Sequence, residues 1–309
     1  MSKAAICVVV PVYKAMATLD RCVESVLAQQ VEGGLTCILV DDGSPDESGA
    51  LCDAWAAKDD RVTVIHQDDL GVSGARNSGL AAADSEFIVF LDSDDALRPG
   101  ALQAALTAQR AAPQDFVVWH YTTDEKDPAA VTADAEPRTQ AGLARLWLDC
   151  LLAMPWNKLY RADLAKQLQF DVQYTLGEDL QFVLDYIALL GQTVPEFGYR
   201  VMTSPLTFYD CSRGGTLSTR YHANYCDIWP KHFAKLNAAC HAAACPAEDM
   251  RPLHRAELQV FAEGVADIMR RDPSPTQRLK GYKAEAALRS PWLRALLERM
   301  KIEHCYSAY

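Results

Sequence analysis

Short runs of β-branched and aromatic residues alternate with stretches of helical periodicity over the first 120 residues. The runs typical of buried strands are AICVVV (5–10), LTCILV (35–40), VTVIH (62–66), FIVFLD (87–92) and FVVWHY (116–121). Between the first two, apolar residues at the spacing i, i+3, i+4, i+7 and i+8 predict a helix that follows Thr18. The next helix is expected to begin at Ser44, with Pro45 in its first turn and Glu47 completing a capping box. This alternation predicts a parallel sheet covered by helices.

The remaining chain divides into further segments. Residues 122–138 are polar and contain few large apolar side chains, which predicts a linker between two subdomains. We expect a helix around 139–152, another over 179–190 and a strand near 205–209. From 222 to 305 the pattern is almost wholly helical, and the breaks in it are at Pro246, at Pro273-Ser274-Pro275 and before Pro291.

Composition and charge narrow the classes of protein to be considered. The 309 residues are half hydrophobic, and the net charge of −11 is concentrated in residues 1–135, which hold 22 acidic and 9 basic residues. An acidic N-terminal part disfavours nucleic acid as a partner and suits a divalent cation. No stretch reaches the roughly 18–20 apolar residues of a membrane-spanning helix, the first residues show no signal-peptide cleavage pattern, and the ten cysteines form no Cys-x-x-Cys pair. We therefore expect a cytoplasmic protein with reduced cysteines.

Polar residues follow the predicted strands, at the edge where parallel sheets bind ligands. Asp41-Asp42 ends the second strand, and Asp92-Ser93-Asp94 ends the fourth. Two carboxylates at spacing i, i+2 can hold Mg²⁺ or Mn²⁺, whereas the alternative interpretation is an Asx-turn or a helix cap. Several acids converging on one crevice would repel each other without a cation, and this favours a ligand site.

Two common nucleotide-binding motifs are missing. Pro11-Val12-Tyr13 follows the first strand in place of a glycine-rich turn, and the glycines of 71–79 do not match a P-loop. Within that stretch, Arg76 could neutralise a phosphate or order an aspartate, or it could be a solvated helix arginine.

Several motifs in a fixed order resemble one enzyme family. VVVPVYKAMATLDRCVESVLAQQ, ILVDDGSPDESG and GVSGARNSGLAAADSEFIVFLDSDD resemble the nucleotide-sugar-binding half of the inverting family-2 glycosyltransferases, and PWNKLYR and LGEDLQF resemble their acceptor half. The resemblance covers roughly residues 5–220. It implies a GT-A fold, a Rossmann-like and mostly parallel sheet with helices on both faces, over 1–220, with halves at 1–121 and 139–220. A helical C-terminal region, 221–309, would follow.

The resemblance also implies residue roles. The nucleotide would be bound by Pro11, Tyr13, Asp41, Asp42, Arg76, Asp92 and Ser93, with Asp42 accepting from the uracil N–H and Asp92 facing the ribose. Asp94 would bind the Mn²⁺ or Mg²⁺ that bridges the diphosphate, and the adjacent Asp95 has no assigned role. The general base falls on Asp179, with Glu178 as its rival. Before the resemblance is considered, the pair alone favours an acidic helix N-terminus stabilised by the helix dipole, and the resemblance reverses this preference.

The chemistry of an inverting transfer fits one carboxylate and one metal. Direct displacement needs a base on the acceptor hydroxyl and charge stabilisation of the departing diphosphate. The second carboxylate of glycoside hydrolases is not required, because the metal-bound diphosphate is already a good leaving group.

Three further features leave alternatives open. Trp156 either stacks on a sugar or belongs to the core, and Arg213 begins an Arg-Gly-Gly-Thr segment that is either a mobile loop near the diphosphate or a glycine turn. Residues 278–301 form a basic amphipathic pattern that either lies on an anionic membrane or packs on the domain or on another subunit.

The sequence thus predicts a metal-dependent inverting hexosyl- or N-acetylhexosaminyltransferase. It would move a sugar from a UDP-sugar to a glycan or lipid-linked glycan hydroxyl in bacterial surface polysaccharide synthesis, in the cytoplasm or at the inner face of the membrane. The alternatives are a catalytically inactive nucleotide-sugar or glycan-binding module and a sugar nucleotidyltransferase. The set Asp42, Asp94 and Asp179 argues against the first, and the missing glycine-rich basic loop after the first strand argues against the second.

Overall fold

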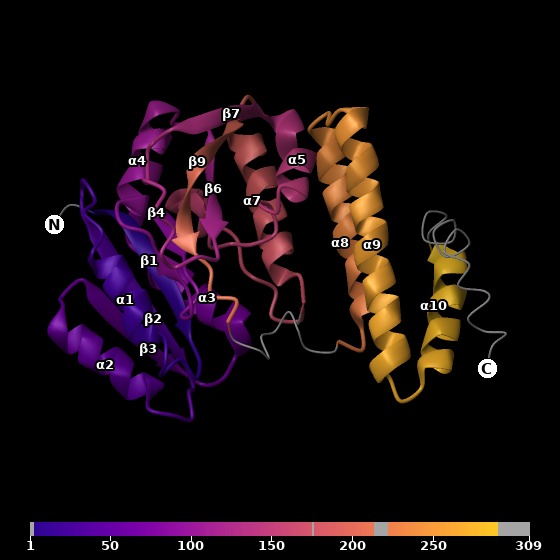
Figure 1. Ribbon diagram of the computed structural model, residues 1–309, viewed down its shortest axis with the longest axis horizontal. Helices are drawn as coiled ribbons and strands as arrows, with labels where there is room; N and C mark the ends of the chain where they lie inside the picture. Colours follow the sequence, from indigo (N-terminus) through magenta and orange to yellow (C-terminus); the bar gives the residue numbers. More distant parts are fainter. Residues whose placement is uncertain (1–2, 175, 213–221, 290–309) are drawn as a thin grey trace.

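A single mixed sheet forms the centre of the protein, whose computed structural model describes residues 3–174, 176–212 and 222–289 (Figure 1). The nine strands follow the order β3-β2-β1-β4-β8-β6-β9-β5, and β7 pairs with β9. Their bounds are β1 (Ala4–Val12), β2 (Leu35–Asp42), β3 (Val62–Gln67), β4 (Ser85–Phe90), β5 (Ala96–Leu97), β6 (Phe116–Thr122), β7 (Ala135–Thr139), β8 (Lys158–Arg161) and β9 (Gly198–Phe208). Strands β1 to β4 pair in parallel, whereas β8 is antiparallel to both β4 and β6.

Helices cover both faces of this sheet, as predicted. The helices are α1 (Leu19–Leu27), α2 (Ser48–Lys58), α3 (Gly71–Ala82), α4 (Ala101–Ala111), η1 (Gln140–Gly142), α5 (Leu143–Leu148), α6 (Ala162–Ala165), α7 (Glu178–Thr193), α8 (Tyr225–Ala242), α9 (Ala247–Arg271) and α10 (Pro275–Arg289). One apolar core joins the sheet to α1, α2 and α4, and a second joins it to α3, α5, α6 and α7. Side chains of β1 alternate between the two cores, because successive residues of a strand point to opposite faces.

The pairing register brings the carboxyl ends of the first four strands to one edge. Asp41 pairs with Val12 of β1 on one side and with His66 of β3 on the other, and Val9 of β1 pairs with Phe90 of β4. The acidic residues after β2 and β4 therefore lie at the same edge of the sheet.

Helix α3 lies close against this sheet because of a glycine. A Cβ atom at Gly79 would lie 2.3 Å from Val9 Cγ1 and 3.2 Å from Val40 Cγ2. The small residue lets the helix backbone approach β1 and β2, and this approach carries Arg76 of the same helix to the candidate site.

Three local predictions differ from the structure. Helix α2 begins at Ser48 rather than at Ser44, because the Ser44 N–H donates to Asp41 Oδ1 (3.2 Å) and its hydroxyl accepts from the Lys14 N–H (3.3 Å). The polar stretch 122–138 contains most of β7, which pairs with β9. The helix expected over 139–152 is reduced to η1 and α5.

The helical C-terminal region packs beside the sheet. Figure 1 shows α8 and α9 as an antiparallel pair next to α7 and α5, with α10 on the far side of α9. Trp229 and Phe233 of α8 stack with ring centroids 5.2 Å apart. Among the helices of the described residues, none combines the length and apolar character that crossing a membrane requires.

The predicted tail pattern, 278–301, is described only as far as residue 289. Leu279 is buried, and Arg278 Nε donates to the Ala223 carbonyl (2.7 Å) and lies 3.4 Å from Asp272. The start of this segment thus contacts its own chain, and the remainder lies outside the described residues. The division at 121/139 and at 220/221 stays a prediction, although β8 and β9 of the second half pair within the same sheet as the first.

Candidate functional site

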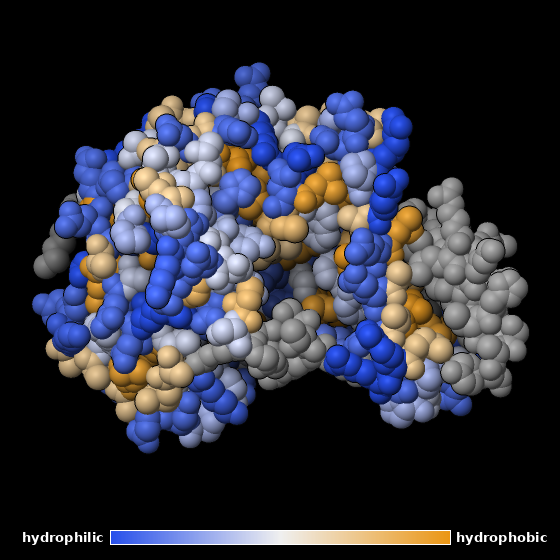
Figure 2. All heavy atoms as spheres, in the orientation of Figure 1, coloured by the Kyte–Doolittle hydropathy of each residue, from blue (hydrophilic) through white to orange (hydrophobic). Residues whose placement is uncertain are grey.

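Most of the predicted site residues lie at or just beyond the carboxyl ends of β1, β2 and β4 or in the first turn of α7. On the face drawn in Figure 2, the surface is hollowed between the part that contains the sheet and the α8–α9 pair. In Figure 1, which has the same orientation, the first turn of α7 lies beside this hollow.

The Asp42 carboxylate is oriented by two donors on a single oxygen. Gln67 Nε2 donates to Asp42 Oδ1 (2.7 Å), and the Leu70 N–H donates to the same oxygen (3.0 Å). Within the described part of the chain, no donor reaches Oδ2. A fixed carboxylate with one unshared oxygen is suited to accept a hydrogen bond from a planar N–H donor.

Asp41 is engaged by the protein on both oxygens. Oδ1 accepts from the Ser44 N–H, and Oδ2 lies 3.0 Å from His66 Nδ1, whose Nε2 lies 2.9 Å from Asp53 Oδ1. Hydrogen bonds to Asp53 and Asp41 raise the pKa of His66. Burial raises the pKa of Asp41, but the bonds from Ser44 and His66 outweigh it and leave the pKa below its ordinary value. Both Asp41 oxygens are thus used in hydrogen bonds that stabilise the end of β2, and its predicted contact with nucleotide stays a prediction.

Pro11 and Tyr13 differ in accessibility. Pro11 is buried within β1 and pairs with Val40, whereas the Tyr13 side chain, just beyond the strand, is 44 % exposed. The Lys14 ammonium lies 5.0 Å from the centre of the Tyr13 ring. An exposed aromatic ring just beyond β1, whose last residue Val12 pairs with Asp41, is a suitable stacking surface for a base.

Arg76 joins two of the predicted site carboxylates. Its guanidinium is only 3 % exposed; Nη1 donates to Asp179 Oδ1 (2.7 Å) and Nη2 donates to Asp92 Oδ1 (2.8 Å). It also lies 5.4 Å from the centre of the Phe170 ring. Burial lowers the pKa of Arg76, but the charges of Asp179 and Asp92 more than reverse this, so the group stays cationic. The solvated-arginine interpretation was wrong, and the interpretation that Arg76 orders an aspartate holds for both partners.

Asp179 lies in the first turn of α7, after Gly177, whose φ of +77° favours glycine. Burial raises the pKa of Asp179 to about 7, although Arg76 lowers it. A carboxylate that titrates near neutral pH and has one oxygen held by an arginine is suited to general base catalysis. Glu178 precedes it and is buried, whereas the Asp179 side chain is 30 % exposed; of the two, only Asp179 bonds to Arg76.

Residues 92–95 form a turn, which we call the acidic turn. The Asp95 N–H donates to the Asp92 carbonyl (3.0 Å), and Asp92, Ser93 and Asp94 are partly exposed while Asp95 is fully buried. Burial raises the pKa of Asp95 to about 9, with Asp92 as the next contribution. Asp95 therefore lies in the interior, whereas the other three residues of the turn reach the surface.

The acidic turn could supply only some of the ligands that a hard divalent cation requires. Among the described residues, no group of three His, Cys, Asp or Glu side chains is arranged to hold a metal. Mg²⁺ and Mn²⁺ accept one or two protein carboxylates when phosphate oxygens and water complete the coordination. The oxygen donors of Asp92 and Asp94 match that chemistry.

Two predicted contacts have different outcomes. Trp156 is 4 % exposed and stacks on Tyr209 with ring centroids 5.3 Å apart and an interplanar angle of 18°. Tyr121 contacts the Trp156 ring edge-on, so the structure favours the core interpretation. Arg213 lies outside the described residues.

Four residues that contact the predicted site residues were given no role from the sequence: Arg21, His66, Gln67 and Asp210. His66 and Gln67 carry a signal, because they end the third predicted strand at the same edge as Asp41 and Asp42. Arg21 and Asp210 carry none, because they are 189 residues apart and meet only in the fold.

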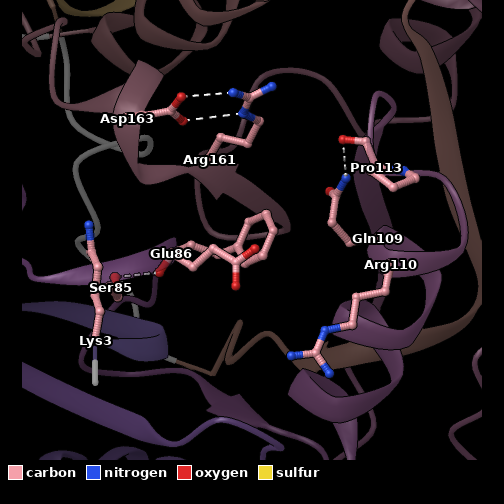
Figure 3. Close-up of a pocket in the computed structure, with 9 residues that line it drawn as sticks. Lys3, Ser85, Glu86, Gln109, Arg110, Pro113, Arg161 and Asp163 are labelled. Carbon is pink, nitrogen blue, oxygen red and sulfur yellow. Dashed lines mark hydrogen bonds and ion pairs between the residues drawn. The ribbon is translucent and has the colours of Figure 1, made fainter. Parts of the chain in front are cut away.

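A separate cavity of about 520 Å³ lies at the opposite edge of the sheet (Figure 3). Lys3, Glu86, Arg110 and Arg161 are among its lining residues, and Arg161 is already paired with Asp163 (2.7 Å). None of the predicted site residues lines this cavity.

Comparison with known proteins was made by sequence and by structure. A sequence model of the family described as Glycosyl transferase family 2 matches residues 7–169. Glycosyltransferase GlyG of Streptococcus pneumoniae is 39 % identical over 124 residues, which are 40 % of this chain and 41 % of GlyG. The succinoglycan biosynthesis protein ExoO of Rhizobium meliloti is 31 % identical over 211 residues, 62 % and 58 % of the two chains. The chain thus spans about half the length of these curated relatives.

The fold is shared with a solved structure. S. aureus TarS 1–349, in complex with UDP-GlcNAc, superposes with a TM-score of 0.66 at 16 % identity, over 96 % of this chain and 83 % of TarS. At this identity the similarity concerns the arrangement of strands and helices.

Proposed function

The chain belongs to glycosyltransferase family 2 and has the GT-A fold, and from this premise we propose that it is a metal-dependent inverting glycosyltransferase. It transfers a hexosyl or N-acetylhexosaminyl group from a UDP-sugar to a hydroxyl of a glycan or lipid-linked glycan. The observation that carries the proposal is the pair of hydrogen bonds that Arg76 donates. One goes to the predicted base Asp179, and the other goes to Asp92 on the predicted donor side.

A uridine nucleotide matches the residues at the end of β2. The free oxygen of Asp42 would accept from the uracil N–H, while Gln67 and Leu70 hold the carboxylate in place. Tyr13 would cover the base with its exposed ring. The UDP-GlcNAc complex of TarS, a protein with the same fold, supports a UDP-sugar donor.

The carboxylates of the acidic turn and of α7 would divide the chemistry. Asp94 would bind Mn²⁺ or Mg²⁺, which would neutralise the charge of the leaving diphosphate. Asp179 would remove the proton of the acceptor hydroxyl through Oδ2, because Oδ1 is held by Arg76. Arg76 counteracts the effect of burial on Asp179, whose pKa is about 7, and its two hydrogen bonds connect Asp179 to Asp92.

The biological setting is proposed from the relatives. ExoO is named for succinoglycan biosynthesis, and this supports a role in bacterial surface polysaccharide synthesis. A UDP-sugar donor would place the reaction in the cytoplasm, and a lipid-linked acceptor would place it at the inner face of the membrane.

Three variants test the division of roles. Asp94→Asn should abolish the metal-dependent part of UDP binding, since an amide does not replace a carboxylate on a hard cation. Asp179→Asn should leave UDP binding within about twofold and lower turnover of UDP-sugars by at least about 100-fold, the range of a lost general base. Glu178→Gln is the matched control and should retain most turnover.

Titration calorimetry with UDP and Mn²⁺, together with a UDP-release assay over a panel of UDP-sugars, measures both quantities. Equal loss of UDP binding in Asp94→Asn and Asp179→Asn would contradict the assignment. Release of pyrophosphate in place of UDP would indicate a nucleotidyltransferase, and UDP binding without turnover on any donor would indicate a binding module.

A further inference from the structure

A network of partly buried polar contacts joins α1, the acidic turn and the residues just after β9. Arg21 Nη2 donates to the Asp94 backbone carbonyl (2.5 Å) and to Asp210 Oδ2 (2.6 Å). Nη1 lies 3.6 Å from the Glu125 carboxylate, and the guanidinium lies 5.0 Å from the centre of the Phe208 ring. One side chain therefore contacts both the backbone of the predicted metal ligand and the residue that follows β9 by two positions.

Asp210 is itself held by hydrogen bonds from Ser212, and in this fixed position it orients the Arg21 guanidinium. Its Oδ1 accepts from the Ser212 N–H (2.9 Å) and from the Ser212 hydroxyl (2.5 Å), while Oδ2 accepts from Arg21. The bonds from Ser212 and then Arg21 lower the pKa of Asp210 to about 2, so it is ionised at neutral pH. Its side chain is 9 % exposed, which limits screening by water.

A second connection closes the network. The Asp210 N–H donates to Asp95 Oδ1 (3.0 Å), and Asp95 is fully buried. The backbone of Asp94 and the side chain of Asp95, adjacent residues of the acidic turn, are thus both attached to Asp210, one through Arg21 and one directly.

We propose that Arg21, held by Asp210, is a positioning residue that orients the Asp94 carboxylate for metal binding. The inference rests on the proposed function, because it takes Asp94 as the metal ligand. The bonds to the Asp94 carbonyl and to Asp95 Oδ1 hold the backbone on the C-terminal side of Asp94, which restricts the ψ rotation of Asp94 and with it the directions that its side chain can take. With few protein ligands in the site, the direction of this one carboxylate controls the affinity for the cation. Residues that orient metal ligands typically change metal affinity by about 10–100-fold when they are lost.

Asp210→Asn and Arg21→Gln remove the two parts of the network. The amide introduced by Asp210→Asn can present an N–H to the guanidinium in place of an acceptor, and the shorter side chain introduced by Arg21→Gln cannot reach both partners. We expect UDP to bind at least about tenfold more weakly in the presence of Mn²⁺ and within about twofold of wild type in EDTA. Arg21→Lys retains a single cationic donor group and should give an intermediate loss.

Asp115→Asn is the matched control. Asp115 pairs with Arg200 at the opposite end of β9 (2.8 Å), and the side-chain exposures of the pair, 31 % for the arginine and 9 % for the aspartate, equal those of Arg21 and Asp210. Asp115 also accepts from a backbone N–H, that of Gly198. Because this pair is remote from the acidic turn, its loss should destabilise the fold to a similar degree without changing the metal dependence of UDP binding.

Calorimetric titration of UDP, with Mn²⁺ and with EDTA, on the four variants and wild type decides the matter, with thermal unfolding as a check of folding. Weakened Mn²⁺-dependent binding in the Arg21 and Asp210 variants, with Asp115→Asn unchanged, supports the inference. Unchanged Mn²⁺-dependent binding, or an equal loss in Mn²⁺ and EDTA, overturns it while leaving the donor site intact. If wild type itself shows no metal-dependent UDP binding, the proposed function and this inference are both overturned.

Discussion

Replacing Arg76 by methionine should destabilise the protein strongly and in a pH-dependent manner. Arg76 is 3 % exposed and bonds to Asp179 at 2.7 Å and to Asp92 at 2.8 Å. Removing one partner of a buried ion pair typically costs about 3–5 kcal/mol, because the remaining charge is uncompensated. The two carboxylates are 28 % and 30 % exposed, so water can partly solvate them, and we expect a loss near the lower limit, about 3 kcal/mol at pH 8. Methionine fills most of the volume beside Phe170, which keeps the cavity contribution small.

The pH dependence has a definite sign. Burial raises the pKa of Asp179 to about 7 even though Arg76 lowers it, so the pKa must rise further in the variant. Because the pKa of Asp179 is higher in the folded than in the unfolded state, the protein loses stability as pH rises from the unfolded-state pKa to the folded-state pKa. Without the Arg76 cation the folded-state pKa is higher still, so the loss of stability continues to a higher pH and is larger. The difference between wild type and Arg76→Met should therefore be larger at pH 8 than at pH 6, where folded Asp179 can take up a proton.

Urea unfolding at the two pH values measures this difference. The control is Arg161→Met, which removes an arginine whose partner Asp163 is 62 % exposed, and it should cost less than about 1 kcal/mol at either pH. A loss below about 1 kcal/mol for Arg76→Met, or a loss that grows toward pH 6, would refute the reasoning.

Two further predictions concern the surroundings of the site. Gly79→Ala should destabilise the fold by about 1–3 kcal/mol, because its Cβ would lie 2.3 Å from Val9 Cγ1, whereas Gly281→Ala, with no atom within 4 Å, should gain up to about 1 kcal/mol. Thermal unfolding compares the two, and a shift in the same direction for both would contradict the packing argument. His66→Gln should be less stable than wild type at pH 6, and the difference should shrink as pH rises through the raised pKa of His66, since only the cation pairs with Asp53 and Asp41. Urea midpoints between pH 6 and 9 test this, and a difference that widens with pH would be evidence against a charged His66.

The N-terminal strands and their acidic ends could be predicted because the information is local. Each strand run is followed within a few residues by its polar end, and parallel pairing then brings Asp41, Asp42 and Asp92 to one edge whatever the later sequence does. The helix boundary at Ser44 was wrong because a tertiary contact, the bond from Lys14, draws that serine into a loop.

The connections between distant segments could not be predicted. Strand β8 inserts between β4 and β6, although β6 comes earlier in the chain. Arg76 meets Asp179 across 103 residues, and nothing in the helix periodicity around Arg76 distinguishes a buried bridge from a solvated side chain. Trp156 was ambiguous for a similar reason: a tryptophan among apolar residues is compatible with a sugar contact, and only the stacking on Tyr209 shows that it packs internally.

The most direct test of the proposed function is calorimetric titration of UDP into the purified protein, first with Mn²⁺ and then with EDTA, with GDP as the competing nucleotide. The arrangement of Asp42, Gln67 and the acidic turn predicts binding of UDP in Mn²⁺, a marked loss in EDTA and weaker binding of GDP. Absence of UDP binding in both conditions would contradict the donor assignment and leave only the family membership and the fold.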